Sequence, residues 1–185
     1  MKTLYIPLLL IVFLTASCNK KDSPDSTDMA NEENKEKLGK SDAGDDADFA
    51  VAAADGGMLE VQLGQLALKN ASSQQVKQFA QQMVDDHGKG GVQLKALAEG
   101  KGISLPTVLS DKNQKIVDDL SLKTGVEFDK EYAKLMVDDH RKDVDAFRKE
   151  SEKGNDPELK AWAGETLPML EHHLQMAESN HKSLQ

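Results

Sequence analysis

Two copies of the pentapeptide Met-Val-Asp-Asp-His lie at residues 83–87 and 136–140, and each ends in a histidine that helical periodicity predicts to be buried. A buried imidazole needs a hydrogen-bond partner or a metal ion, because an unpartnered polar group destabilises an apolar core. The same periodicity directs one carboxylate and one further imidazole toward the core from neighbouring helices. The candidate metal ligands are therefore Glu60, His87, His140 and His173.

Carboxylate and imidazole side chains in a helical core are the ligands that proteins use for Fe, Mn, Zn or Cu. Three aspartates lie beside these ligands in the sequence, and we expect them to fix the histidine tautomers by hydrogen bonding. They are Asp86, Asp139 and Asp143. A purely structural polar network, in which the imidazoles bond only to protein groups, is the alternative and remains open at this point.

The heights of the four groups along their helices predict two layers. Counting from the expected turn near Ala71, Glu60 and His87 would be offset by ~7 Å along the helix axis. A similar offset is expected between His140 and His173 about the turn near Asn155. The sequence therefore predicts that the four groups do not share a single coordination sphere.

Glycines cluster near these positions, although each weakens a helix by about 1 kcal/mol relative to alanine. Gly88, Gly90 and Gly91 follow the first pentapeptide copy, and we expect them to allow a neighbouring helix to approach closely, in preference to forming a hinge. Gly56 and Gly57 are expected to leave room beside the first histidine for a side chain or a ligand.

Apolar periodicity predicts helices almost throughout the second part of the chain, with almost no strand signal. Glycines, a proline and a capping aspartate punctuate the pattern. The expected helices cover residues 48–70, 73–99, 110–123, 127–153 and 156–180. Four long helices and one short helix indicate a four-helix bundle with an additional short helix.

The first residues resemble a targeting signal. Residues 1–17 combine a positive start, an apolar run and small residues, as a lipoprotein signal peptide does. Cys18, the only cysteine, would then carry the lipid, whereas an ordinary signal peptide with an unmodified cysteine is the alternative. Residues 18–47 are polar and acidic, which predicts a disordered linker. The protein is thus expected to be exported and anchored in the cell envelope, in the outer membrane facing the periplasm or the surface.

The net charge of −9 and the isoelectric point near 5.0 argue against a nucleic-acid partner. A Gly-rich phosphate loop, a Ser–His–Asp order and a Cys-X-X-Cys motif are all missing from the sequence. The expected partner is the membrane, through the lipid on Cys18. The sequence names no protein partner, and a homo-oligomer is left open.

Several stretches of the folded part, taken together, resemble domain-of-unknown-function family 4142. They are residues 52–57, Glu60-Val61, Leu63-Gly64, 76–80, both pentapeptide copies, 101–106, Phe128-Asp129 and 167–174. The resemblance covers about residues 49–177 and implies a ferritin-like bundle in an exported bacterial protein without an established activity. The positions that match are Glu60, Asp86, His87, Asp139, His140 and His173. The predicted fold is all-α: a ferritin-like up-down four-helix bundle with an additional short helix, over residues 48–183.

The chain also departs from related patterns. Gly90 and Gly91 replace the Ala-Asn usual in the family, and Gln93 replaces a common glutamate. Val84 and Val137 stand where the di-iron ferritin motif Glu-X-X-His needs glutamate, so the resemblance does not imply iron-oxidase chemistry.

The leading functional interpretation is a lipid-anchored binding or structural module of the cell envelope, with a buried polar centre and without demonstrated catalysis. The alternative is a metal-binding protein for storage, sensing or redox chemistry. A third interpretation is a protein–protein adaptor that acts through a helix face.

Overall fold

The computed structural model describes residues 24–39 and 42–185, and within these ranges it contains six α-helices and no strand. The all-α fold class predicted from the sequence is therefore confirmed. The helices are α1 (Ser26–Leu38), α2 (Asp42–Asn70), α3 (Gln74–Lys101), α4 (Asp111–Ser121), α5 (Gly125–Lys153) and α6 (Pro157–Ser183). The predicted signal peptide and Cys18 lie outside the described residues.

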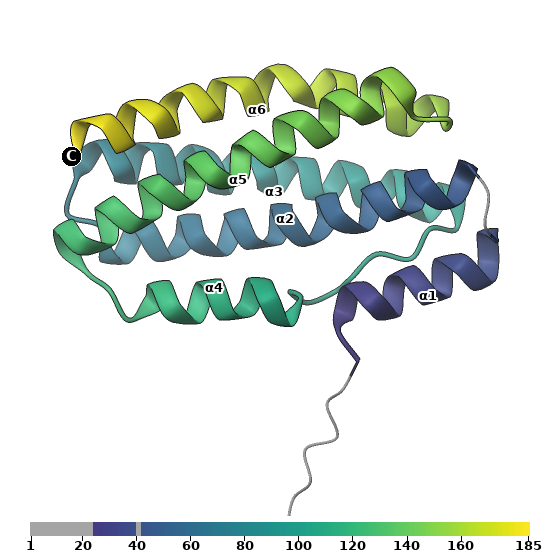
Figure 1. Ribbon diagram of the computed structural model, residues 1–185, viewed down its shortest axis with the longest axis horizontal. Helices are drawn as coiled ribbons and strands as arrows, with labels where there is room; N and C mark the ends of the chain where they lie inside the picture. The colour runs from purple at the N-terminus through teal and green to yellow at the C-terminus, as the bar shows by residue number, and fades with distance from the viewer. Residues whose placement is uncertain (1–23, 40–41) are drawn as a thin grey trace, which may run out of the picture.

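Four long helices lie side by side as two hairpins, with α1 and α4 beside α2 (Figure 1). A three-residue turn joins α2 to α3, and another joins α5 to α6. Residues 102–124, which include α4, carry the chain back along the bundle, so α3 and α5 run in the same direction (Figure 1). Because of this crossover the long helices do not strictly alternate in direction along the chain, as a simple up-down order would require.

The linker predicted over residues 18–47 is wrong in its described part, where α1 and the start of α2 are helical. Asp25 caps α1 by accepting a hydrogen bond from the backbone N–H of Thr27. Asn34 is buried, and its side chain forms two hydrogen bonds with the backbone of Ser104, at 2.7 and 2.9 Å. This helix therefore gains stability from polar contacts with a distant loop, which a count of apolar residues does not register.

The apolar core consists of two clusters that flank the histidine positions along the bundle. One cluster contains Met83, Phe79, Tyr132 and Met136, and the other contains Leu94, Phe147, Trp162 and Leu170, each with further apolar neighbours. Along α3, α5 and α6, each inward histidine lies between a residue of one cluster and a residue of the other. The packing thus holds a polar layer between two apolar ones.

Three buried aspartates accept hydrogen bonds from backbone N–H groups just before other helices begin. Asp129 accepts hydrogen bonds from the backbone N–H groups of Ser72 and Ser73 ahead of α3. Asp55 accepts from the backbone of Ser110, the residue that caps α4, at 2.8 Å. Asp46 does the same for the N–H groups of Asn155 and Asp156 before α6. A carboxylate suits a helix N-terminus because the free N–H groups there carry partial positive charge. These bonds fix the heights of the helices, and hence the heights of the residues they carry.

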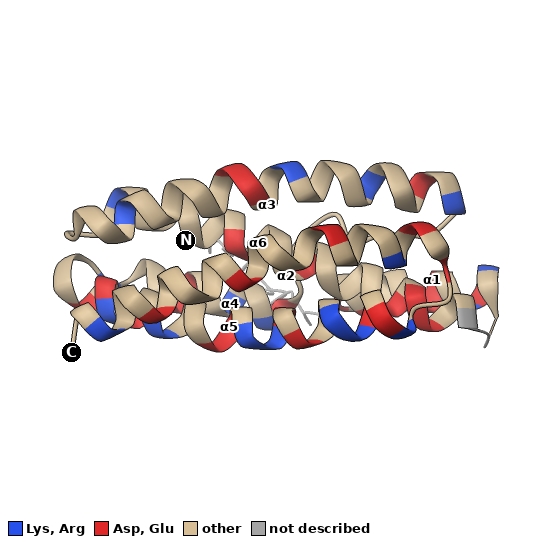
Figure 2. Cartoon of the chain, turned by 90° about the horizontal axis from the view of Figure 1, so that it is seen from above, with Lys and Arg blue, Asp and Glu red and all other residues tan. Residues whose placement is uncertain are grey.

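Acidic and basic residues are closely interspersed along α5 (Figure 2). In the ranges that the structure describes, no helix combines the length and the apolar character that crossing a bilayer requires.

Candidate functional site: a buried histidine and carboxylate cluster

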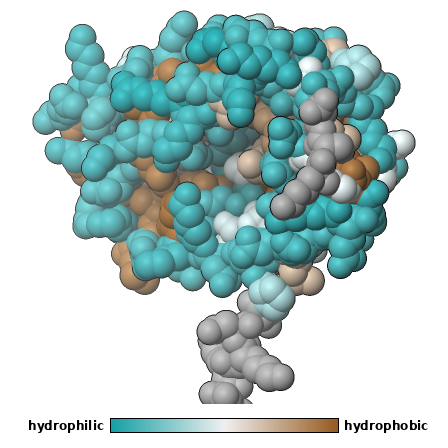
Figure 3. Space-filling view, turned by 45° about the vertical axis from the view of Figure 1, so that its right-hand side comes forward, coloured by the Kyte–Doolittle hydropathy of each residue, from teal (hydrophilic) through white to brown (hydrophobic). Residues whose placement is uncertain are grey.

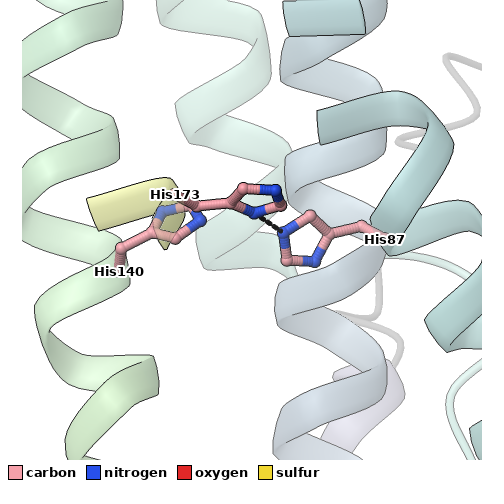
Figure 4. Close-up of side chains that lie close together, drawn as sticks. All are labelled: His87, His140 and His173. Atoms are coloured by element: carbon pink, nitrogen blue, oxygen red, sulfur yellow. Dashed lines mark hydrogen bonds between the residues drawn. The ribbon is translucent and has the colours of Figure 1, made fainter. Parts of the chain in front are cut away.

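Helices α3, α5 and α6 each contribute one inward histidine to a single cluster (Figure 4). Ring nitrogens of His87, His140 and His173 all lie within 4.8 Å of one another. Glu60 joins them from α2: its Oε2 lies 2.7 Å from Nδ1 of His87, and its Oε1 lies 3.3 Å from Nε2 of His140. Glu60, His140 and His173 are at most 1% exposed. The four residues selected from the sequence therefore come together.

The predicted separation into two layers is wrong, and the reason is the direction of the side chains. Each Cα–Cβ bond in a helix tilts toward the N-terminus of that helix. In the α2–α3 hairpin, His87 lies farther from the turn than Glu60, but His87 leans toward the turn and Glu60 leans away from it. The same geometry brings His140 and His173 together in the α5–α6 hairpin. Backbone height alone therefore overestimates the separation.

Hydrogen bonds to groups that only accept define which nitrogen carries the hydrogen in two of the rings. The Nδ1–H of His140 donates to the backbone carbonyl of Met136 at 3.0 Å, so its Nε2 carries the lone pair that faces Glu60. The Nε2–H of His173 donates to the carboxylate of Asp86 at 3.2 Å, so its Nδ1 carries the lone pair that faces His87. Asp86 thus has the orienting position expected from the sequence.

The other two aspartates lie on the carboxylate side of the cluster. Carboxylate oxygens of Glu60, Asp139 and Asp143 lie within 4.8 Å of one another. Burial, reinforced by the charge of Asp139, raises the pKa of Glu60 well above its usual value. Burial and the neighbouring charge of Glu60 likewise raise the pKa of Asp143, and burial raises that of Asp139. These carboxyl groups therefore retain protons more readily than exposed ones, unless a cation compensates their charge.

The imidazoles are held in their neutral form. Burial lowers the pKa of His87 to about 4, and the charges of nearby aspartates oppose this only in part. Burial, with the other two imidazoles, lowers the pKa of His140 to about 3. Burial also lowers that of His173 to about 4. Neutral imidazole is the form that binds metal ions, because protonation removes the lone pair.

Several buried polar atoms in the described residues have no hydrogen-bond partner, and three of them belong to the cluster around Glu60. Oε1 of Glu60 and Nε2 of His140 face each other without forming a hydrogen bond, and Oδ2 of Asp139 is also unpartnered. Unpartnered buried atoms are uncommon in folded proteins and destabilise them. Two acceptors that face each other, such as a carboxylate oxygen and an imidazole lone pair, are suited to hold a proton or a cation between them.

One pair of nitrogens has the spacing of two ligands on a tetrahedral ion. Two ligands at bond lengths of about 2.0–2.1 Å on such an ion lie about 3.3–3.4 Å apart. Nε2 of His87 and Nδ1 of His173 are 3.3 Å apart (Figure 4). With Nε2 of His140 and Oε1 of Glu60, they form a set of three nitrogens and one oxygen.

A cavity of about 670 Å³ reaches this cluster from between α2 and α3. Glu60, His87, Asp86 and Asp143 line one part of it, and most of the other lining residues are apolar or glycine. Apolar residues also gather around a hollow on the face shown in Figure 3. Glu60 and His87 are therefore the members of the cluster that the cavity reaches.

The five glycines near the first histidine border this cavity and do not allow two helices to pack closely. A Cβ added at Gly56, Gly57, Gly88, Gly90 or Gly91 would meet no atom within 4 Å. All five line the cavity, so the predicted close approach of a neighbouring helix is wrong at residues 88–91. The room expected beside Gly56 and Gly57 is present. The glycine that does allow close packing is Gly64, whose added Cβ would lie 2.9 Å from the carbonyl oxygen of Ala80.

Some residues of this region were not singled out from the sequence. Trp162 and Phe147 line the cavity, and nothing in the sequence around them distinguishes them from ordinary core residues. Residues of the loop after α3, among them Ile103 and Pro106, close one side of it, and α1 holds that loop through Asn34. No local sequence signal marks these roles, because each depends on contacts between distant segments.

Fold and site together define an all-α protein with a buried histidine and carboxylate cluster. The family model described as Domain of unknown function (DUF4142) matches residues 29–179, and the chain belongs to this family. The match begins within α1, in agreement with the helical start of the described chain. Comparison with curated proteins found no match, and comparison with solved structures found none either.

Proposed function

We propose that this protein binds a transition-metal ion through His87, His140, His173 and Glu60. The observation that carries the proposal is the pair of unpartnered atoms, Nε2 of His140 and Oε1 of Glu60, that face each other at 3.3 Å beside two further imidazoles. A cation between these atoms would satisfy both. It would also allow Glu60 to be ionised while Oε2 accepts a hydrogen bond from Nδ1–H of His87.

The composition of the ligand set narrows the choice of ion. Three imidazoles and one carboxylate suit Zn, Cu, Fe or Mn, whereas Mg and Ca prefer oxygen ligands only. Asp139 and Asp143 add negative charge near Glu60, which would compensate a divalent ion in a buried place. Asp86 would orient His173 and raise the basicity of its ring.

The proposal includes an architecture and a location. Two helical hairpins joined by a crossover, with ligands projecting inward from all four long helices, support a ferritin-like bundle. The apolar run before Cys18 supports export and lipid anchorage in the cell envelope, in the outer membrane facing the periplasm or the surface. Storage, sensing and redox chemistry are all compatible with such a site.

Metal loading tests the proposal. The full chain, purified without a histidine tag, is stripped with a chelator and titrated with Zn²⁺ by calorimetry and with Co²⁺ by visible absorption, which reports tetrahedral coordination. We expect one ion per chain. His140→Ala should weaken binding at least tenfold, whereas His172→Ala, which removes an exposed histidine on α6, should leave it unchanged. Absence of stoichiometric binding by either ion would overturn the proposal.

A structural network is the second candidate, and a specific observation favours it. Glu60, His87, His173 and Asp86 form a continuous chain of close polar contacts. In a protonated state, Glu60 donates to His87, His87 donates to His173, and His173 donates to Asp86. This chain leaves Nε2 of His140, Oε1 of Glu60 and Oδ2 of Asp139 without partners. Protein that binds no metal, but loses stability on His87→Ala, would establish this alternative.

The anchor is tested separately from the metal. Cys18→Ala should move the protein from the membrane fraction to the soluble envelope fraction, because a lipid on Cys18 would be the only attachment. A Ser17→Ala variant is the matched control, since it alters the neighbouring residue and retains the cysteine. Unchanged fractionation of the Cys18→Ala protein would contradict the anchor.

A further inference from the structure

The cavity is much larger than a metal ion needs. Its volume of about 670 Å³ lies within the range of pockets that enclose organic ligands. Glycines at five lining positions preserve this space, although alanine would fit at each of them and would strengthen the helices. Glycine at these positions therefore lowers the stability of the helices and keeps the cavity open, which indicates that the open volume has a function.

An aromatic group forms one wall. Trp162 lies 5.3 Å from Phe147 and 6.2 Å from Phe49, measured between ring centroids, and the second pair meets edge to face. Trp162 and Phe147 line the cavity. Aromatic rings favour offset or edge-to-face contact with further rings, so this wall offers a planar aromatic guest more than area alone.

The same wall carries an unpartnered donor. Trp162 is 8% exposed, and its indole Nε1 is buried without a hydrogen-bond partner. The indole N–H can only donate, so a guest that satisfies it must present an acceptor such as a carbonyl oxygen. A buried tryptophan N–H ordinarily has a partner, so this unpartnered N–H is a donor that a ligand in the cavity could satisfy.

We propose that the cavity binds a planar aromatic molecule that carries a hydrogen-bond acceptor, with its ring against Trp162 and Phe147 and its acceptor at the Trp162 N–H. The proposal is independent of the metal, because it rests on the aromatic end of the cavity. A saturated alkyl chain would fill the volume but would offer neither ring contacts nor an acceptor along its length. The polar end, with Glu60 and His87, would face the remaining part of the guest.

The neutral fluorescent ketone Prodan is a suitable probe, because its naphthalene ring and carbonyl match the proposed chemistry. Trp162 is the single tryptophan of the chain, so energy transfer from tryptophan to Prodan reports binding near this residue. The measurement uses the full chain with Cys18→Ala in a chelator, which avoids detergent and metal. We expect saturable energy transfer and a blue shift of the Prodan emission.

Two leucine substitutions test the location. Gly90→Leu places a side chain in the cavity and should weaken Prodan binding at least tenfold. Gly100→Leu lies on the same helix but outside the cavity lining, with equal space around its Cβ, and should leave binding within twofold. Equal binding by the two variants would overturn the proposed site.

The hydrogen bond has its own test. Trp162→Phe retains an aromatic ring and should weaken Prodan binding about fivefold, as the loss of one hydrogen bond of ~1 kcal/mol predicts. Because this variant has no tryptophan, the blue shift of the Prodan emission measures its binding. The analogue 2-dimethylaminonaphthalene, which lacks the carbonyl, should bind both proteins with equal affinity, as measured by its own emission.

Displacement by competitors tests the class of ligand. If dodecanol displaced Prodan at the same concentration as 2-acetylnaphthalene does, the cavity would be an alkyl site, and this would contradict the proposal. Binding that survives His140→Ala separates this result from the fate of the metal site.

Discussion

Oε1 of Glu60 and Nε2 of His140 lie 3.3 Å apart in the centre of the bundle, and neither atom has a hydrogen-bond partner. The tautomer of His140 is defined on its other side by the carbonyl of Met136, so the ring cannot turn its N–H toward Glu60 without losing that bond. In the metal-free protein two hydrogen-bond acceptors therefore face each other. A proton, an amide N–H or a cation between them would remove this unfavourable contact.

Glu60→Gln should have opposite effects on stability and on metal affinity. The amide N–H₂ of glutamine can donate to Nε2 of His140, so the free energy of unfolding of the metal-free protein should rise by about 1 kcal/mol. Loss of the carboxylate should weaken Zn²⁺ binding at least tenfold. Urea unfolding in a chelator and calorimetric titration measure the two effects. Glu60→Ala, which leaves Nδ1 of His87 without its partner and provides no metal ligand, should lower both. A fall in both for Glu60→Gln would contradict this explanation.

Two glycine-to-alanine substitutions should change stability in opposite directions. Gly90→Ala adds a methyl group in open space within α3, and the helix should gain up to about 1 kcal/mol. Gly64→Ala places its Cβ 2.9 Å from both the carbonyl oxygen of Ala80 and Cγ2 of Val84, so it should lower stability by about 1–3 kcal/mol. The midpoints of urea unfolding measure both. A stabilising Gly64→Ala would show that α2 and α3 are not in close contact there.

The contact between α1 and the loop after α3 should be measurable. Asn34→Ala removes two hydrogen bonds to the backbone of Ser104 in a buried place, and should lower the free energy of unfolding by about 1–3 kcal/mol. Glu36→Ala, on an exposed position of the same helix, is the control and should change it by less than about 0.5 kcal/mol. Hydrogen exchange in residues 103–109 should increase only in the first variant. Equal exchange in the two would mean that α1 does not hold the loop.

Glu150 should make stability fall as the pH rises. Burial, with the charges of Asp46 and Asp156, raises the pKa of Glu150 to about 7, while Lys149 and Lys160 oppose the shift. Between its ordinary value of 4.5 and about 7, the folded state binds more protons than the unfolded state. This contribution to stability is therefore full below pH 4.5 and is lost as the pH rises through about 7.

Glu150→Gln should remove that part of the pH dependence. The variant should gain on the order of 1 kcal/mol relative to the parent between pH 5 and pH 8, after allowance for solvent screening. Urea midpoints at several pH values measure the difference. Glu152→Gln, an exposed change on the same helix, should run parallel to the parent. Parallel curves for both variants would show that Glu150 is ionised throughout this range.

The inward residues could be predicted from the sequence because helical periodicity and the repeated pentapeptide depend on neighbours a few positions apart. For the same reason the five helices from 42 to 183 were located to within a few residues, except for the early start of α2. The relative heights of Glu60 and His87 required the tilt of their side chains as well as the length of the chain between them. Helix α1 was missed because Asn34 and its partner Ser104 are 70 positions apart.

A glycine within a predicted helix is compatible with two different surroundings. Close packing and open space both favour glycine at a helix position, and only the neighbours of the added Cβ separate the two. Gly64 and Gly90 represent one case each. The proposed role of Trp162 could not be predicted either. It rests on an indole N–H group without a hydrogen-bond partner, and the sequence does not reveal which groups lack partners.

The early start of α1 also sets how far the folded domain can stand from a membrane. Cys18 and Asp25 are seven positions apart, and a fully extended chain spans at most about 3.3–3.6 Å per residue. A lipid on Cys18 would therefore keep the first turn of α1 within about 25 Å of the bilayer surface, roughly the thickness of two helices. Since α1 is bonded to the loop that closes the cavity, the same anchor would also limit how far that loop can lie from the bilayer surface.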